Sequence, residues 1–527
     1  MTNDNIQSIE DFDPDAPPFA EFRDWCTVSE CSTNNRQLFE SKNDLSIRLQ
    51  KLRKLILSIE NIEVQKEIRS FYVLNLNCLN FKNSILELND LVIPCSVNQK
   101  NFQVISENIN IKNSVIEGDL NLFCTQINGA LVVDGTRILG NLSLAGATLR
   151  GDFSFLSGEI AGYLSFNGAE LLGDVNISNL IVGGECSFFK TKINGFVTAN
   201  EADLSEGLIF KKSEIHEKLE LIEVKIKKNL DIGNISSKSD IVFDNSTIGG
   251  NLLISKSNRS ISGHVSGENA VVKSDFVFDF FHFFEASFKG LSVGGTTTFK
   301  GSSHSILPDF RDAEFGRAPE VANMRISPPE MSYRGAKLES HNGKIFQIAA
   351  NSDDVAKYRK LKAMALAAND HEKDIEFFAY EMQAKRGVEQ GSSTTVELLF
   401  NSAYYWLSNY GQSFKRPFYW MMGSFGFFGL FYLFFATQIL PYWQAMAFAL
   451  GHSFKNVVPL FTTLVRLGGR PEGYETNYNL AFAKLANGQN GTALVDGLLL
   501  VSYVQQFIGI VLLFLLLLAL RNKFRLK

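Results

Sequence analysis

Glycine recurs at a spacing of eleven residues through the middle of this 527-residue chain. Each glycine opens a unit whose third and fifth positions are apolar, as in GDLNLFCTQIN at 118–128 and GNLSLAGATLR at 140–150. The regular glycines are Gly118, Gly129, Gly140, Gly151, Gly162, Gly173, Gly184 and Gly195. Further on the glycine is lost, but apolar pairs such as Leu219 and Leu221, or Leu252 and Ile254, keep the same phase. Apolar residues two positions apart indicate short strands with one buried face.

An eleven-residue period is also compatible with a helical coiled coil. A glycine in every unit would cost such a helix about 1 kcal/mol each time, and the β-branched and aromatic residues of the units favour strands. The sequence therefore predicts a mainly β chain with additional helices, built on a β-solenoid over residues 72–340. Two units are expected to form one coil of about 22 residues, with a cap on each end of the stack.

The repeat units resemble those of bacterial pentapeptide-repeat-like proteins, which share the G-x-L-x-L start followed by a turn. A passage closer to a strict pentapeptide follows at 309–318, with the sequence DFRDAEFGRA. The resemblance implies a right-handed, quadrilateral β-helix. Since the period here is eleven rather than five, the cross-section is free to depart from that family's square.

Charge and cysteine content argue against several classes of function. The net charge is −5, and the repeat surface mixes signs, as in KKSEIHEKLE at 211–220, so no nucleic-acid partner is expected. None of the six cysteines forms a C-x-x-C pair, which favours reduced thiols packed in a core over a zinc or redox site. The sequence predicts neither a cofactor nor a metal site.

The N-terminal part is expected to contain a lead and a cap. Residues 1–40 are acidic and carry prolines, which predicts a flexible lead with no signal peptide. Residues 41–71 predict an amphipathic helix, because Leu45, Leu49, Leu52 and Ile56 recur at helical spacing. This helix is interpreted as the cap of the first coil, with a membrane-surface helix as the alternative.

The C-terminal part changes to helical and then to apolar patterns. Residues 353–390 predict a helical hairpin that links the solenoid to the membrane part of the chain, and residues 394–416 predict an interfacial helix rich in tyrosine and tryptophan. Residues 417–527 predict a membrane domain with two spans, because 418–439 and 498–520 carry no charged residue. A more polar half-segment at 445–465 lies between the two spans.

Basic residues flank the outer ends of both predicted spans. Lys415 and Arg416 precede the first span, and Arg521, Lys523 and Arg525 follow the second. Positive charge marks the cytoplasmic side of membrane proteins. We therefore expect a multi-pass protein of the inner (cytoplasmic) membrane, with the solenoid and both termini in the cytoplasm.

The helical and membrane parts carry a second resemblance, to membrane-bound pentapeptide-repeat proteins. Their segments are similar to YRKLK at 358–362, DHE at 370–372, EMQAKR at 381–386, YGQSFKRP at 410–417 and ALRNKFR at 519–525. Some of these relatives are labelled membrane-associated oxidoreductases. The chain lacks a G-x-G-x-x-G on a strand-to-helix turn and a haem-type signature, so an enzyme is not expected and an oxidoreductase stays a remote alternative.

The order of span, half-segment, loop and span resembles two-span ion channels with a pore helix. The T-V-G-Y-G filter of potassium channels is absent. The candidate residues for a pore lining or for a helix interface are Ser502, Gln505, Gln506, His452 and Lys455. Two spans cannot enclose a pore, so a homo-oligomer in the lipid bilayer with a channel-like domain is the leading hypothesis. The alternative is a non-conducting, membrane-tethered scaffold that binds a cytoplasmic protein through the solenoid.

Overall fold

The structure is a computed structural model that divides into two compact units, Met1–Ser332 and Tyr333–Lys527. It describes residues 12–13, 16–22, 42–76, 85–98, 104–105, 108–233, 236–237, 240–255, 263–279, 285–299, 303–304, 307–326, 338–340, 347–349, 353–386, 395–438, 440–458 and 491–524. The two units are described one at a time.

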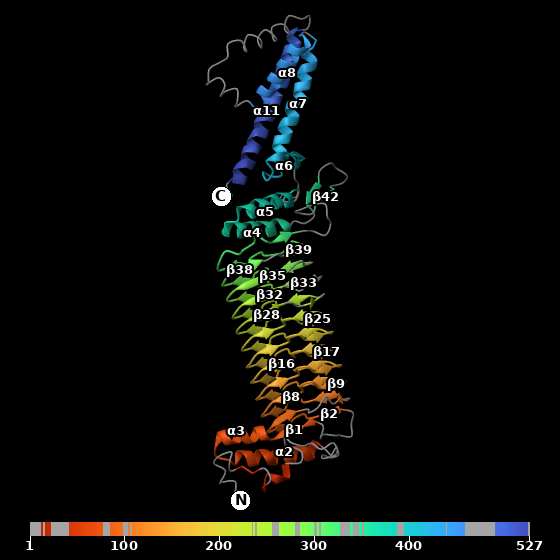
Figure 1. Cartoon of the computed structure of the whole chain (residues 1–527), viewed down its shortest axis with the longest axis vertical. Helices are drawn as coiled ribbons and strands as arrows, with labels where there is room; N and C mark the ends of the chain where they lie inside the picture. The colour runs from red at the N-terminus through yellow and green to blue at the C-terminus, as the bar shows by residue number, and fades with distance from the viewer. Residues whose placement is uncertain are drawn as a thin grey trace. The chain divides into compact units, whose positions relative to one another are not determined.

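The first unit is a parallel β-solenoid with four sheets (Figure 1). One coil consists of β8 (Leu120–Asn121), β9 (Gln126–Ile127), β10 (Leu131–Val132) and β11 (Arg137–Ile138), one strand in each sheet. The next strand, β12 (Leu142–Ser143), pairs with β8 so that Leu142 faces Leu120, 22 residues earlier. The predicted coil of two eleven-residue units is therefore confirmed.

Each sheet runs through most of the stack. The first extends from β1 (Val73–Asn75) to β38 (Thr297–Phe299), and the second from β2 (Ile85–Glu87) to β36 (Glu285–Ser287). The third extends from β3 (Val92–Ile93) to β40 (Glu314–Phe315), and the fourth from β5 (Val104–Ile105) to β29 (Ser236–Ser237). A last pair, β39 (Ser303–His304) and β41 (Arg325–Ile326), continues the parallel pairing. The right-handed winding of the coils that the family resemblance implies stays a prediction.

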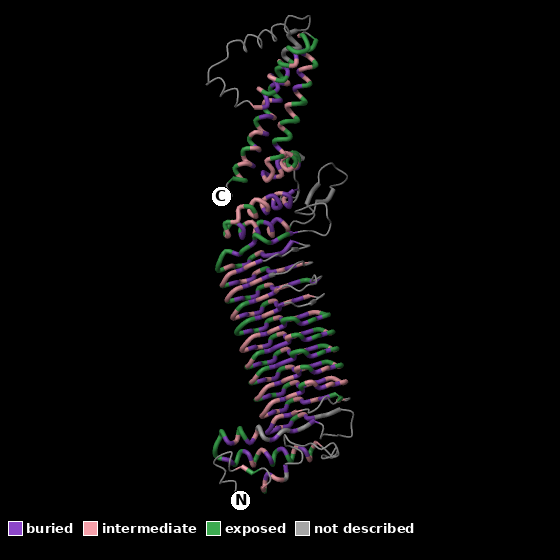
Figure 2. Tube along the Cα trace, in the orientation of Figure 1, coloured by how far each residue is buried: buried purple, intermediate pink, exposed green. Residues whose placement is uncertain are grey.

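Apolar residues of successive coils stack into columns inside the solenoid, and Figure 2 shows buried positions alternating with exposed ones along the coils. The rings of Phe166, Phe188 and Phe210 lie parallel, with centroids 4.6 and 4.7 Å apart. Coil spacing and ring stacking distance thus coincide, since neighbouring strands are about 4.8 Å apart.

The start of each unit explains the glycine and, in four of the eight regular units, the Asp or Asn that follows it. At Gly151 a Cβ atom would lie 2.6 Å from the Ala130 nitrogen and 2.7 Å from the Gly129 oxygen, so only glycine allows this approach between coils. The next side chain bridges coils: Asp119 Oδ1 accepts a hydrogen bond of 2.7 Å from the Asn141 backbone N–H, and Asp152 Oδ1 accepts one of 2.9 Å from that of Asp174. The repeat therefore encodes coil-to-coil contacts as well as strands.

The turn of each unit contains one residue in the left-handed backbone region. These residues recur every eleven positions at Asn113, Cys124, Gly135, Gly146, Ser157, Gly168, Asn179, Lys190, Glu201, Lys212 and Glu223. Asn and Gly adopt this conformation at low cost. The turn geometry thus keeps the eleven-residue grid after the glycines at the start of the units have disappeared.

Two helices cover the N-terminal coil, where a single helix over 41–71 was expected. They are α2 (Lys42–Leu57) and α3 (Ile62–Phe71). The chain breaks between them because Asn61 caps α3, its Oδ1 accepting a hydrogen bond of 3.0 Å from the Glu63 N–H. In the expected flexible lead, residues 16–22 contain the short 3₁₀ helix η3 (Ala20–Phe22) and the buried side chains of Phe19 and Phe22.

An ion cluster attaches this cap to the solenoid. The carboxylate of Glu117 is 5% exposed and lies 2.8 Å from Arg53 Nε and 3.3 Å from Arg69 Nη2. Arg53 belongs to α2 and Arg69 to α3. One buried carboxylate therefore contacts both capping helices.

The second unit contains one small hairpin of strands and six described helices. The strands β42 (Leu338–Ser340) and β43 (Gln347–Ala349) pair antiparallel with each other. The solenoid was expected to extend to residue 340, but residues 338–340 do not continue its parallel sheets. Pro328 and Pro329 precede them in the sequence, and proline removes a ladder hydrogen-bond donor. The helices are α4 (Asp353–Ala367), α5 (His371–Ala384), α6 (Thr395–Ser408), α7 (Lys415–Ala436), α8 (Tyr442–Val457) and α11 (Gly491–Phe524).

Two of these helices are long and apolar enough to cross a membrane: α7, and the part of α11 at Gly497–Phe524. They overlap the two predicted spans. The first span was expected to reach residue 439, but α7 ends at Ala436 and Thr437 and Gln438 form a turn, while residue 439 lies outside the described residues. Large apolar side chains on both helices are exposed, such as Leu430 and Phe507 at 70% each. A solenoid joined to two such helices fits a membrane-anchored solenoid.

Candidate functional site

A cluster of polar side chains among apolar ones lies where α7, α8 and α11 pack together. The helix α8 forms contacts with both α7 and α11. Seven polar side chains meet between the three helices: Tyr432, His452, Ser453, Asn456, Ser502, Gln505 and Gln506. We call this set the polar core.

Gln505 is the centre of the polar core. Its side chain is fully buried, and its Oε1 accepts a hydrogen bond of 2.9 Å from the Tyr432 hydroxyl. Its Nε2 donates to Ser453 Oγ over 2.8 Å and to the Ser453 carbonyl over 3.2 Å. One amide of α11 thus contacts both α7 and α8.

Ser502 and His452 form the second link, one turn earlier on α11. The Ser502 hydroxyl donates to the Leu498 carbonyl over 2.8 Å, and His452 Nε2 lies 2.8 Å from the same hydroxyl. Because the hydroxyl proton is directed to Leu498, this geometry favours the tautomer in which His452 Nε2 carries a proton and donates to Ser502. The imidazole also packs edge-on against the Tyr432 ring, 4.6 Å between centroids.

Asn456 completes the network at the end of α8. Its Nδ2 lies 3.3 Å from Gln505 Oε1, and its Oδ1 accepts a hydrogen bond of 3.0 Å from Gln506 Nε2. The Ser453 hydroxyl donates to the Phe425 carbonyl of α7 over 2.8 Å. Satisfied polar groups of this kind hold helices together where water is scarce.

The end of α8 lies directly against the backbone of α11. At Gly509 a Cβ atom would lie 2.7 Å from the Val457 carbonyl oxygen and 2.8 Å from that of Asn456. The backbone leaves the helical conformation at Val458, the C-cap residue. The described part of α8 therefore ends at the level of Gly509.

The structure brings together four of the five candidate residues chosen from the sequence. Ser502, Gln505 and His452 are buried between helices of one chain, and Gln506 is partly buried beside Asn456. Lys455, also partly buried, lies near the end of α8. A pore-lining role for these residues stays a prediction.

Three members of the polar core were missed in the sequence. Tyr432 is one aromatic residue in a helix rich in them, so nothing in the sequence distinguishes it. Ser453 and Asn456 follow His452 at one and four positions, which places His452 and Asn456 on one helix face. That spacing was a signal from which Asn456 could have been found.

The basic residues that flank the spans lie in a second cluster, at the start of α7 and the end of α11. The Arg416 guanidinium donates to the Tyr405 carbonyl over 2.9 Å and lies 5.2 Å from the centroid of the Tyr405 ring. Arg386 lies 5.3 Å from the same ring centroid. Lys523 Nζ lies 4.4 Å from the Phe414 ring centroid. Lys415 and Arg521 are exposed, and Arg525 lies outside the described residues.

A buried charge just after α5 joins the hairpin α4–α5 to the later helices of this unit, and α11 contacts the segment before α7. Arg386 is buried and donates to the Tyr410 hydroxyl over 2.7 Å, and Asn522 at the end of α11 donates to the Gly411 carbonyl over 3.3 Å. Within the hairpin, Glu381 is ion-paired with Lys362 and with Lys385. Burial alone would raise the pKa of Glu381, but hydrogen bonds and charge attraction from the two lysines outweigh it and hold the pKa below its usual value.

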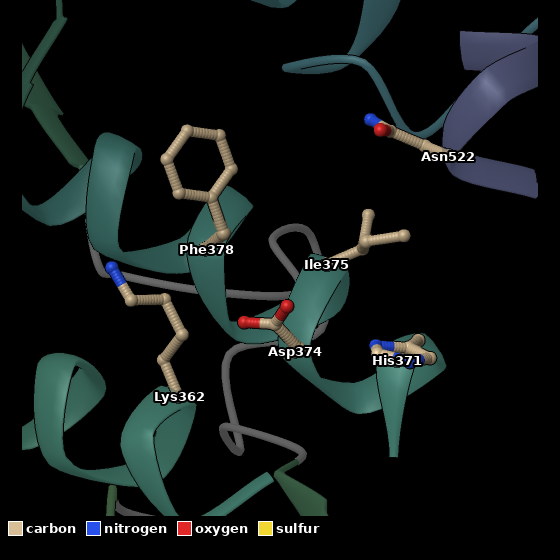
Figure 3. A pocket seen from close by; sticks show the side chains of 6 residues that line it. All are labelled: Lys362, His371, Asp374, Ile375, Phe378 and Asn522. Atoms are coloured by element: carbon tan, nitrogen blue, oxygen red, sulfur yellow. The ribbon is translucent and has the colours of Figure 1, made fainter. Parts of the chain in front are cut away.

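A cavity of about 300 Å³ lies between the hairpin and the end of α11 (Figure 3). Lys362, His371, Asp374 and Phe378 come from the hairpin, and Asn522 comes from α11. The Lys362 ammonium is already paired with Glu381. Across the residues that the structure describes, no group of three His, Cys, Asp or Glu side chains could hold a metal ion.

Comparison of the chain with protein families, with curated proteins and with solved structures finds no match.

Proposed function

We propose that the chain is one subunit of an oligomeric, channel-like membrane protein in which α8 acts as a pore helix and the solenoid lies in the cytoplasm. The observation that carries this proposal is the place where α8 ends. Gly509, against which the last α8 carbonyls lie, is the midpoint of the uncharged segment 498–520. At 1.5 Å per residue, this point is about 17 Å from either end of the segment.

A helix that ends at this depth is difficult to reconcile with a simple anchor. The last carbonyl groups of a helix have no partner within it, and hydrocarbon offers none. Non-helical backbone at membrane depth is tolerated where it is buried in protein or lines a water-filled cavity. Since α7 and α11 of one chain cannot enclose such a cavity, the proposal requires several copies around it.

The direction of α8 favours cations over anions. The C-terminal end of a helix carries a partial negative charge, and in this arrangement that end is directed toward the middle of the membrane. The polar core supports this direction, because Gln505, Ser502 and Tyr432 hold α8 between the two apolar helices. We therefore propose a cation pathway, without assigning the ion.

The orientation follows from the flanking charges. Lys415 and Arg416 lie at one end of α7, and Arg521 and Lys523 lie at the end of α11. By the positive-inside rule, the start of α7 and the end of α11 both lie on the cytoplasmic side of the membrane. A reporter fused to the C-terminal end of the full-length chain, or protease treatment of inverted vesicles, tests this: activity of the reporter outside the cell would refute the orientation.

Two measurements on the full-length protein test the pore. Native mass spectrometry in mild detergent is expected to give one defined symmetric oligomer, and liposomes containing the protein are expected to release monovalent cations. Gln506→Leu tests the lining, because Gln506 is only partly buried, and Tyr503→Leu is the matched control on the exposed face. A flux that changes in the first variant and not in the second supports a pore near Gln506.

A monomer without flux would leave a membrane-tethered scaffold as the function. Exposed aromatic side chains at the solenoid corners favour this second candidate, namely Phe123 at 57%, Phe196 at 47% and Tyr163 at 44% exposure. Such residues are typical of surfaces that bind other proteins. Capture of one defined cytoplasmic protein by the full-length chain, lost in Phe123→Ser and Phe196→Ser, would establish the scaffold. Neither candidate includes a catalytic step or a cofactor.

A further inference from the structure

We propose that the apolar groove between α6, α7 and α11 holds one chain of an anionic phospholipid, whose phosphate lies at the basic residues around the start of α7. This inference concerns a lipid ligand, which the pore proposal does not assign. It shares with that proposal only the insertion of α7 and α11 into a membrane.

The groove has a volume of about 640 Å³ and an almost wholly apolar lining. Its walls include Trp420 and Phe427 on α7, Phe507 and Val511 on α11, and Leu407 at the end of α6. Gly423 opens the wall on α7, because a Cβ atom added there would meet no atom within 4 Å. The groove therefore lies alongside the membrane segments and is accessible from the lipid.

The shape and lining of the groove suit a hydrocarbon chain. On α7 the lining runs from Trp420 to Phe428, which is about 12 Å at 1.5 Å per residue. A flexible acyl chain can follow an apolar groove of this length alongside the membrane segments.

The charges near the start of α7 identify the head group as anionic. Lys415 is exposed at the first residue of α7, Arg416 follows it, and Lys523 lies over the Phe414 ring at 4.4 Å. Among the described residues no carboxylate is ion-paired with any of these three cations. Clusters of Lys and Arg immediately outside a membrane helix attract anionic lipids.

Aromatic residues lie at the end of the groove that is nearest to the charges in the sequence of α7. Trp420 is 50% exposed, and its Nε1 lies 3.4 Å from the Trp406 carbonyl oxygen. Tryptophan side chains at this level are typical of the membrane interface. The order of cations, tryptophans and apolar groove matches the order of phosphate, glycerol region and acyl chain in a phospholipid.

The test compares two glycines of α7 in the full-length protein. The protein is reconstituted in vesicles of phosphatidylglycerol and phosphatidylethanolamine, extracted in mild detergent, and its retained lipid is counted by native mass spectrometry. Gly423→Leu fills the groove and is expected to lower retained phosphatidylglycerol by about tenfold, while Gly426→Leu retains it. Gly426 is the matched control, because its Cβ position is also empty within 4 Å but it does not line the groove.

A second pair of measurements does not depend on the folding of the glycine variants. The wild-type protein is expected to retain phosphatidylglycerol in preference to phosphatidylethanolamine, and the double substitution of Lys415→Gln with Lys523→Gln to reduce that preference by about tenfold. Equal retention of both lipids by the wild type, or equal retention by the two glycine variants, overturns the proposal. A lower oligomer mass in Gly423→Leu with unchanged lipid assigns the groove to a second copy and also overturns it.

Discussion

Substitution of Gly509 by alanine tests whether α8 ends against the middle of α11. The added methyl group would lie 2.7 Å from the Val457 oxygen and 2.8 Å from the Asn456 oxygen. Both oxygens belong to the backbone, so no side-chain rotation can relieve the contact. A C–O contact of about 3.3 Å is the short end of what proteins tolerate, so the end of α8 must move by about 0.6 Å.

The expected cost follows from two opposing effects. Overpacking at a well-packed contact costs about 1–3 kcal/mol, and alanine in place of glycine within a helix gains about 1 kcal/mol. Gly497→Ala in the same helix provides the control, because its Cβ position meets no atom within 4 Å. Since both variants share the helical gain, the difference between them is about 1–3 kcal/mol and reports the contact alone.

Thermal unfolding of the full-length protein in mild detergent is the assay. Three of the four tryptophans, Trp406, Trp420 and Trp443, lie in helices of the C-terminal unit, so their emission follows that unit. A difference of 1–3 kcal/mol corresponds to a melting temperature lower by about 3–10 °C for Gly509→Ala than for Gly497→Ala. Equal melting of the two variants would refute the packing of α8 on Gly509, and the pore-helix proposal would lose its main support.

Three further predictions concern the solenoid and the hairpin. Glu117→Ala removes the carboxylate that Arg53 and Arg69 share, and is expected to destabilise the cap by about 1–3 kcal/mol. Hydrogen exchange should become faster in the capping helices and stay unchanged in the central coils. Gly151→Ala is expected to destabilise the solenoid more than Gly168→Ala. The new Cβ atom at position 151 would lie 2.6 Å from backbone atoms of the preceding coil, whereas the one at position 168 meets nothing within 4 Å and the variant carries only backbone strain of about 1 kcal/mol. Equal midpoints for the two variants in chemical denaturation would contradict this. The pKa of Glu381 is lowered in the folded protein. The ionised carboxylate therefore stabilises the fold fully above the unfolded pKa of about 4.3, and this stabilisation is lost as the pH falls through the lower folded pKa. Unfolding midpoints measured between neutral and acid pH should fall less for Glu381→Gln than for the wild type.

The solenoid could be predicted from the sequence because its repeat is a direct consequence of coil geometry. The pairing of Leu120 with Leu142 reproduces the spacing of two units. The left-handed turn residues at Lys190 and Glu201 could not be predicted, since neither residue type favours that conformation. The neighbouring coils impose the left-handed conformation at these two residues, and the sequence of a single unit does not indicate it.

The polar core could be predicted only in part. Gln505 and Ser502 are conspicuous in an apolar helix, so their need for partners was evident. Their partners depend on which helices pack together, and Tyr432 is separated from Gln505 by 73 positions in the chain. The sequence leaves two roles open for these residues, a pore lining and a helix interface. The structure adds their hydrogen bonds to neighbouring helices of the same chain.

The strand pairing of the solenoid has a consequence for the order in which the protein is made. Partner strands are separated by 21 to 24 residues throughout, from Leu120 with Leu142 to Phe276 with Thr297 and Leu252 with Phe276. Every coil can therefore close on the one before it as soon as it leaves the ribosome, without waiting for distant parts of the chain. Synthesis reaches the apolar helices α7 and α11 only after all these strands have been made, so the N-terminal unit can fold before the last spans exist.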